Sequence, residues 1–193
     1  MTGISTAGET TPLPSTLNHE SDWNRGISWD LYLGSEVRQN VELWEGVWRR
    51  ARSPEDQLNR LREIGRSWRL LVLCEDWCGD ASNTVPVLAR FAADAPSLEL
   101  RILKRDDNLE LMDRYLTGGS RSIPLAILLD EEGDPVGRWG PRPAELQAFV
   151  IHEKRVGVRP AGELYKDTRR WYARDRGVTT IRELVDRIEE AAG

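Results

Sequence analysis

The feature that most constrains the fold is a short, unbroken apolar run at residues 70–74, Leu-Leu-Val-Leu-Cys. A run of this length between polar segments is typical of a strand that is buried on both faces of a sheet. A polar loop at 75–80 follows, and the sequence then predicts a helix over about 81–93. Because α/β sheets place ligands at the ends of such strands, this loop is the first candidate for a functional site.

Further strands and helices are expected along the rest of the chain. Strands are predicted at 98–103, 125–129 and 135–139, the last two joined by a turn at 131–134. Helices are predicted at 108–116, from Pro143 onward, at 164–174 and from Thr180 onward. This order predicts an α/β fold with a central mixed β-sheet flanked by helices.

The segment before the first strand reads as helical. An apolar stripe recurs at Val37, Val41, Trp44 and Trp48, and a second helix is expected after Ser53. Residues 1–22 are rich in Thr, Ser, Gly and Pro and predict a disordered or loosely docked tail. The expected organisation is therefore a tail (1–22), an N-terminal helical extension (23–67), a core (68–156) and a C-terminal helical extension (157–193).

Composition excludes several classes of function. The net charge of −5 argues against a nucleic-acid partner, and no apolar run is long enough to span a membrane. The N-terminal residues lack the pattern of a secretory signal, so a cytoplasmic location is expected. With two cysteines and two histidines, His19 and His152, both expected at the surface, the sequence predicts no metal site and no cofactor.

The loop after the first strand carries a recognisable motif, Trp77-Cys78-Gly79-Asp80-Ala81. This motif resembles the active-site segment of the thioredoxin superfamily, and in particular bacterial thioredoxin-like proteins that contain Glu-Asp-Trp-Cys-Gly-Asp. Pro86 matches the proline of the family's active-site helix, and Ile123-Pro124 matches its cis-proline segment. The resemblance covers roughly residues 68–155 and implies a thioredoxin-like fold.

The motif departs from the family pattern at two positions. Ala81 stands where a dithiol enzyme has its second cysteine, which would resolve a mixed disulfide. Val72 stands where the family usually has a buried acid. Cys74 is not expected to replace the missing thiol, because on extended chain it would lie about 13 Å from Cys78, whereas a disulfide needs about 7 Å or less. Cys74 is therefore predicted to pack as a small apolar side chain.

Cys78 is the predicted catalytic residue. At a helix N-terminus its thiolate would be favoured, so a pKa below that of free cysteine is expected, with Asp80 opposing the shift. The resemblance implies that Trp77 flanks the sulfur and that the Ile123 backbone offers itself to an extended peptide or to glutathione. Two further residues are candidates for the same groove, Arg142 as a carboxylate ligand and Trp139; the alternative for Arg142 is a solvated loop charge.

Two functions remain open at this point. The first is a monothiol thiol–disulfide oxidoreductase in redox homeostasis, acting on a thiol or disulfide protein or a small-thiol substrate. The second is a non-catalytic binding or adapter domain, or a redox sensor, on the same fold. The motif and the Ile123-Pro124 segment favour the first, whereas Ala81 and Val72 favour the second. A dimer linked through Cys78 is a further alternative, and the sequence predicts no particular oligomeric state.

Overall fold

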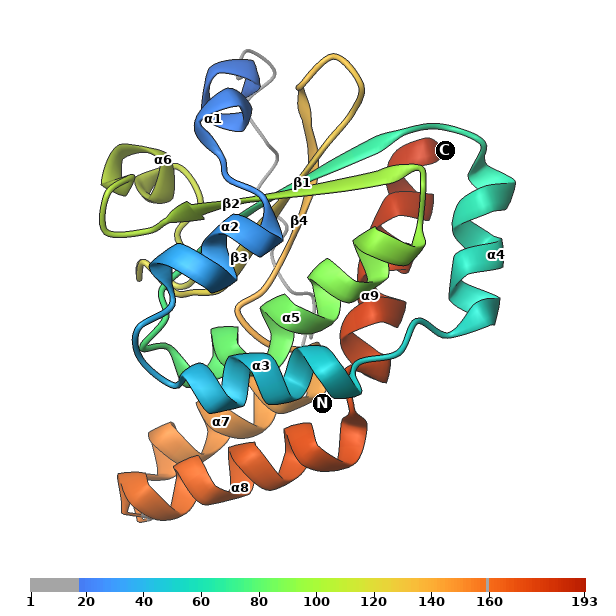
Figure 1. Cartoon of the computed structure of the whole chain (residues 1–193). Coiled ribbons are helices and arrows are strands. Elements are labelled where there is room, and N and C mark those ends of the chain that lie inside the picture. Colours follow the sequence, from blue (N-terminus) through green and yellow to red (C-terminus); the bar gives the residue numbers. More distant parts are fainter. Residues whose placement is uncertain (1–17, 159) are drawn as a thin grey trace, which may run out of the picture.

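A computed structural model describes residues 18–158 and 160–193 and contains a four-stranded mixed sheet (Figure 1). Its strands are β1 (Trp68–Cys74), β2 (Leu98–Lys104), β3 (Leu125–Leu129) and β4 (Pro135–Trp139), in the order β2-β1-β3-β4. Strand β1 is parallel to β2 and antiparallel to β3, and β4 is antiparallel to β3. The predicted α/β fold with a central mixed sheet is confirmed.

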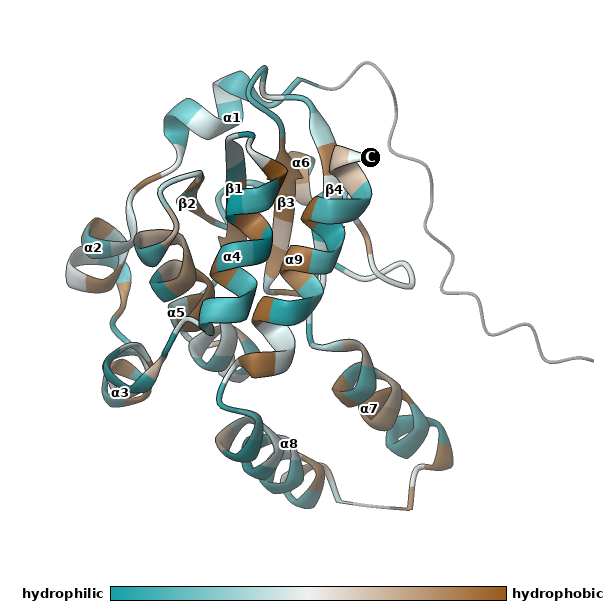
Figure 2. Ribbon diagram, turned by 90° about the vertical axis from the view of Figure 1, so that its right-hand side faces the viewer, coloured by the Kyte–Doolittle hydropathy of each residue, from teal (hydrophilic) through white to brown (hydrophobic). Residues whose placement is uncertain are grey.

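Helices surround this sheet. They are α1 (Glu20–Arg25), α2 (Trp29–Leu31), the π-helical turn η1 (Tyr32–Glu36), α3 (Val41–Arg50), α4 (Glu55–Ile64), α5 (Gly79–Asp94), α6 (Leu109–Asp113), α7 (Ala144–Val156), α8 (Ala161–Asp175) and α9 (Val178–Ala192). Helices α4, α5 and α9 pack together against the sheet (Figure 2). None of the helices in the described residues is both long and apolar enough to cross a membrane.

The central strand is buried as the sequence predicts. Every side chain from Leu70 to Cys74 is inaccessible to solvent. Val72 lies between Ile102 of β2 and Ala126 of β3. The position where the family usually has a buried acid is therefore occupied by an apolar side chain with apolar neighbours on both adjacent strands. These side chains belong to one large apolar cluster, the main core, which also includes β3 and much of α5 and α9.

The chain after β4 is organised differently from the predicted core and extension. The apolar stripe of α9, which includes Ile181 and Val185, packs in the main core. The earlier pair, α7 and α8, forms an antiparallel arm, the α7–α8 hairpin, with its own small apolar cluster (Figure 2). Helix α7, which directly follows the β3–β4 hairpin, therefore does not pack on the sheet. Helix α9, the last helix, packs there instead.

One expectation for the N-terminal extension was wrong. The predicted helical stripe from Val37 is interrupted, because Val37 is extended and α3 begins only at Val41. The carboxylate of Asp76 accepts the backbone N–H groups of Arg38 and Gln39 at 2.8 and 2.7 Å, and these bonds hold that segment out of a helix. Trp44 of α3 is fully buried in the main core, as the stripe predicts.

His19 is buried rather than at the surface of a tail. Its Nε2 lies 2.6 Å from the Tyr115 hydroxyl and its Nδ1 lies 2.9 Å from Asp22 Oδ2. Helix α1 begins at Glu20, inside the predicted tail of residues 1–22; the part of that tail at 1–17 lies outside the described residues. The paired ring nitrogens allow a polar side chain to be buried at this position. His152 is exposed, as expected.

Candidate active site

Cys78 caps the N-terminus of α5. Its Sγ accepts a hydrogen bond from the Ala81 N–H at 3.5 Å, while its own N–H donates to Glu75 O at 3.1 Å. The thiol also lies 3.5 Å from the carbonyl oxygen of Ile123, to which it can donate. The Ile123-Pro124 peptide bond is cis, as the resemblance implies. The structure thus brings the predicted cysteine and the predicted proline segment together.

The acidity of Cys78 differs from the expectation. Burial raises the pKa of the Cys78 thiol above its ordinary value, since only 8% of the residue is exposed, and the nearby Asp80 carboxylate adds to this rise. Backbone N–H groups at the helix start, above all that of Ala81, and the Arg142 guanidinium oppose the rise but do not reverse it. Desolvation of the charged form therefore outweighs the helix N-terminus here.

Cys74 behaves as predicted and does not approach Cys78 as a partner. Both cysteines are free thiols. Cys74 is completely buried at the end of β1 and hydrogen-bonds with the Tyr32 side chain; burial strongly raises the pKa of its thiol. Among the described residues, no three His, Cys, Asp or Glu side chains are placed to hold a metal ion.

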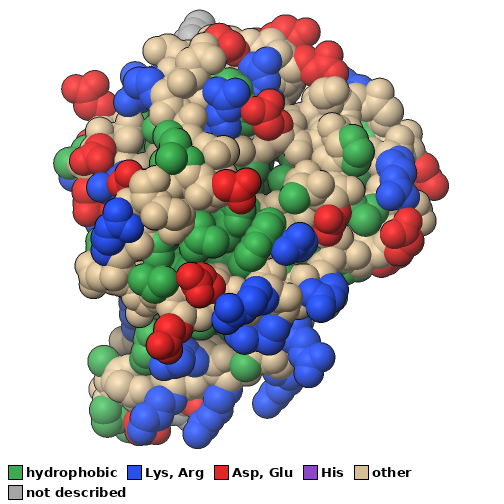
Figure 3. Space-filling view, viewed as in Figure 1, with side chains coloured by type: hydrophobic (Ala, Val, Ile, Leu, Met, Phe, Trp, Pro, Cys, Tyr) green, Lys and Arg blue, Asp and Glu red, His purple; other side chains and the backbone are tan. Residues whose placement is uncertain are grey.

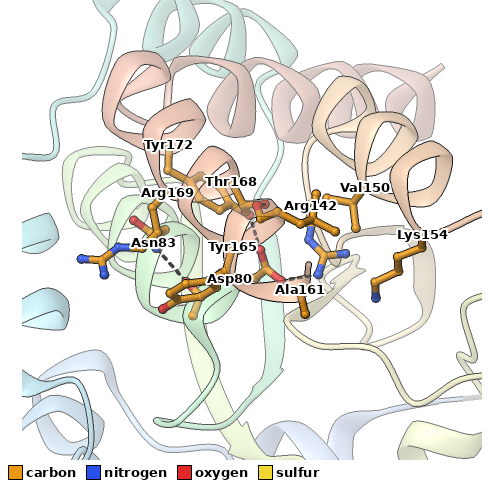
Figure 4. A pocket seen from close by; sticks show the side chains of 12 residues that line it. Asp80, Asn83, Arg142, Val150, Lys154, Ala161, Tyr165, Thr168, Arg169 and Tyr172 are labelled. Atoms are coloured by element: carbon orange, nitrogen blue, oxygen red, sulfur yellow. Dashed lines mark hydrogen bonds and ion pairs between the residues drawn. The ribbon is translucent and has the colours of Figure 1, made fainter. Parts of the chain in front are cut away.

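Asp80 lies at the centre of a polar network that joins α5 to the α7–α8 hairpin (Figure 4). Its Oδ2 is 2.5 Å from Arg142 Nη2, and its Oδ1 accepts a hydrogen bond from the Tyr172 hydroxyl at 2.9 Å. Arg142 also donates to Gln147 Oε1 at 2.8 Å. The sequence left two hypotheses for Arg142, a residue of the cleft or a solvated loop charge. The mostly buried ion pair supports the first hypothesis. Its partner, however, is a carboxylate of the motif itself.

A cavity of about 200 Å³ opens beside this network, between the start of α5 and the α7–α8 hairpin (Figure 4). Asp80 and Asn83 line it from α5, whereas Tyr165 and Tyr172 line it from α8. The Tyr165 ring lies so close to Gly79 that a Cβ added there would be 3.1 Å from it. No sequence pattern pointed to these tyrosines, because α8 meets the motif only through the tertiary fold.

The remaining predicted residues lie on other sides of the motif. Trp77 is 44% exposed, and the Arg105 guanidinium lies 5.1 Å from its ring, so this side chain is available at the surface. Trp139 is buried in the main core, where its Nε1 donates to Glu183 Oε2 at 2.8 Å. Ala81 is fully buried at the position where a second thiol would stand.

The segment before Cys78 is held in place by hydrogen bonds to Glu75, which is buried, and to Asp76. Glu75 Oε1 accepts the Asp106 N–H at 2.7 Å, and burial raises the pKa of this carboxyl. The Asp76 carbonyl accepts bonds from Trp44 Nε1 at 3.0 Å and Asn40 Nδ2 at 3.1 Å. The loop that carries Cys78 therefore rests on the β2–α6 connection and on the N-terminal extension.

The sheet order, the helix-capping cysteine and the facing cis-proline define a thioredoxin-like protein. A family model described as thioredoxin matches residues 26–155, well over half of the sequence, and the chain belongs to this family.

Two solved structures share the fold. One is an HIV epitope-scaffold, with a TM-score of 0.69 and 21% identity, covering 90% of this chain and 99% of its own. The other is a protein of unknown function from Pseudomonas aeruginosa, with a TM-score of 0.68 and 21% identity, covering 91% of this chain and 99% of its own. At this identity the likeness establishes the fold alone. No curated protein matches the sequence.

Proposed function

We propose that this protein carries out monothiol thiol–disulfide exchange through Cys78. The observation that carries the proposal is the position of one sulfur at the N-terminus of α5, 3.5 Å from the Ile123 carbonyl of the cis-proline segment. The same position is the reacting centre of the motif that the sequence shares with the thioredoxin superfamily. Because Ala81 stands where a dithiol enzyme has its resolving cysteine, the second thiol must come from another molecule.

The reaction that fits this site has two exchanges. The Cys78 thiolate attacks a mixed disulfide between a protein and a small thiol, forming a Cys78–small-thiol disulfide and releasing the protein thiolate, which takes a proton from water. A second small-thiol thiolate then attacks the sulfur of the bound small thiol. This step restores the Cys78 thiolate and releases the oxidised, disulfide form of the small thiol. The small thiol is therefore the reductant, and the protein thiol is the reduced product.

The experiment compares reduction of a glutathionylated peptide by wild type, Cys78→Ser and Cys74→Ala, with glutathione as reductant. We expect Cys78→Ser to fall to the uncatalysed rate and Cys74→Ala to retain activity, because Cys74 is buried against Tyr32. Equal rates for wild type and Cys78→Ser would contradict the proposal that Cys78 catalyses this reaction. Loss of activity in a folded Cys74→Ala variant would instead show that the second thiol takes part.

The alternative function is a binding or redox-sensing domain, and one observation favours it specifically. Cys78 is nearly buried and its thiol has a raised pKa, so less of it is thiolate at neutral pH than in an activated cysteine. In that case the exposed Trp77 and the Ile123 segment would serve as a docking surface. Retained partner binding by Cys78→Ser, together with no peptide reduction by wild type, would identify this second function.

A further inference from the structure

We propose that the cavity between α5 and the α7–α8 hairpin is a binding site for a small organic carboxylate. This site is separate from the groove beside Ile123 and Pro124, because neither of these residues lines it. The proposal stands independently of the thiol–disulfide chemistry of Cys78.

The charge of the cavity lining favours an anion. Among the described residues, Arg142, Lys154 and Arg169 line it together with one carboxylate, that of Asp80. That carboxylate is already neutralised by the 2.5 Å ion pair with Arg142. The lining is therefore positive overall in a chain whose net charge is −5. Figure 3 shows basic side chains gathered over the neighbouring parts of α3 and α8.

Two of these cations lack a carboxylate partner within the described residues. Lys154 of α7 and Arg169 of α8 make no ion pair with any residue in the described part of the chain, whereas Lys166 and Arg170, both on α8, pair with Glu163 and Asp167. Arg169 instead lies with its guanidinium 5.7 Å from the Tyr165 ring. A carboxylate entering the cavity would thus meet free donors and would break no existing ion pair at these two residues.

Arg142 adds a donor at the inner end of the cavity. Its Nε is inaccessible to solvent and has no hydrogen-bond partner among the described residues. The guanidinium lies between Asp80 and Lys154 (Figure 4). Because each guanidinium carries five N–H donors, the bonds to Asp80 and Gln147 leave capacity for a further oxygen.

The size and the apolar wall argue for an organic ligand rather than a bare ion. The cavity of about 200 Å³ equals the liquid volume of about seven water molecules at roughly 30 Å³ each. Val150, Ala161 and Leu164 supply an apolar wall opposite the polar groups of α5. A short carbon chain that ends in a carboxylate satisfies both halves of this lining.

The test is a titration of the full chain, followed by two-dimensional amide NMR, with glutarate as the probe and neutral glutaramide as its uncharged counterpart. We expect glutarate to shift the amide signals of 79–83 and 165–169, whereas glutaramide leaves them unchanged. The effect should weaken as salt is raised, because the two free cations are exposed to solvent.

A matched pair of variants locates the binding. Lys154→Gln with Arg169→Gln should weaken glutarate binding by about tenfold, since two charge-assisted contacts are lost. The control, Lys166→Gln with Arg170→Gln, removes the same amount of charge from α8 at two positions that do not line the cavity, and should bind as wild type does. Equal weakening in both pairs, or no shift with millimolar glutarate, would overturn the proposal. Tighter binding of inorganic phosphate than of glutarate would overturn the choice of a carboxylate.

Discussion

The N-terminal extension and the α7–α8 hairpin both contact the loop that carries Cys78, but they are attached in opposite ways. The extension contributes large aromatic side chains to the main core, including Trp44 and Tyr32. The hairpin buries its apolar residues in a cluster of its own, around Leu146, Val150 and Tyr172. It reaches the motif through the polar network of Asp80. The extension side of the reactive loop is therefore held by core packing together with hydrogen bonds to Asp76, whereas the hairpin side is held by hydrogen bonds and one ion pair.

This difference has a physical consequence for stability. Removing a side chain from the main core leaves a cavity that the whole domain must accommodate, so its cost appears in global unfolding. Removing a polar link between two units changes mainly the local opening of the smaller unit. We therefore expect the hairpin to open from α5 more easily than the extension, which cannot leave without exposing the main core.

The largest expected effect comes from Trp44→Ala. Trp44 is fully buried, packs edge-on against Tyr32 at 5.6 Å and donates to the Asp76 carbonyl. Loss of a buried aromatic of this size costs about 3–5 kcal/mol. Denaturant unfolding measures this change. The matched variant Trp171→Ala, in the hairpin cluster, should cost clearly less; an equal or larger cost would break the comparison.

The next effect concerns the anchor between the extension and the loop. Asp76→Ala removes the acceptor of two backbone N–H groups, those of Arg38 and Gln39. Hydrogen bonds to a charged group contribute about 1.5–3 kcal/mol, so we expect a loss in that range. The same denaturation experiment measures it. A change below about 0.5 kcal/mol would mean that the extension is held by its aromatic side chains alone.

A smaller global effect is expected on the hairpin side. Arg142→Gln removes the ion pair to Asp80, and we expect a loss of about 1 kcal/mol in global stability because the pair is only partly screened by solvent. Amide hydrogen exchange should accelerate in α8 and not in α3. Faster exchange in both helices would show that the two regions open together.

The sequence predicted the sheet because its signal is local. An apolar run such as 70–74 identifies a buried strand whatever surrounds it, and the spacing of Cys78 and Pro124 identifies the two sides of the groove. The burial of His19 was missed because its partners, Asp22 and Tyr115, compensate a polar side chain only in the folded chain. The apolar stripe of α9 was visible, but its place in the main core was not.

Only the backbone placement of the candidate site, at the start of a helix, could be predicted from the sequence. The helix position of Cys78 follows from the motif, but its burial depends on the tertiary fold, which brings segments such as Ile123 against the sulfur. The expected low pKa was wrong for this reason, since burial by the fold outweighs the helix end. Tyr165 and Tyr172 belong to no recognisable sequence motif. They line the cavity from the α7–α8 hairpin, and the number of residues between such an added hairpin and the motif it faces is not fixed.

The smallest expected effect tests whether the hairpin side alone tunes Cys78. Burial and Asp80 raise the pKa of the thiol, whereas Arg142 lowers it. The Cys78 thiol therefore ionises with its midpoint above that of free cysteine, which is about 8.5. Its alkylation at pH 7 should be slower than that of a free thiol, because less of it is thiolate. Arg142→Gln should shift the profile of rate against pH to still higher pH. Arg38→Gln, the matched change on the extension, should leave it unchanged, because Arg38 meets Asp76 through its backbone N–H. A shift to lower pH in Arg142→Gln would show that the freed Asp80 carboxylate no longer faces the sulfur. An equal shift in both variants would show that overall charge, and not the hairpin, sets the reactivity.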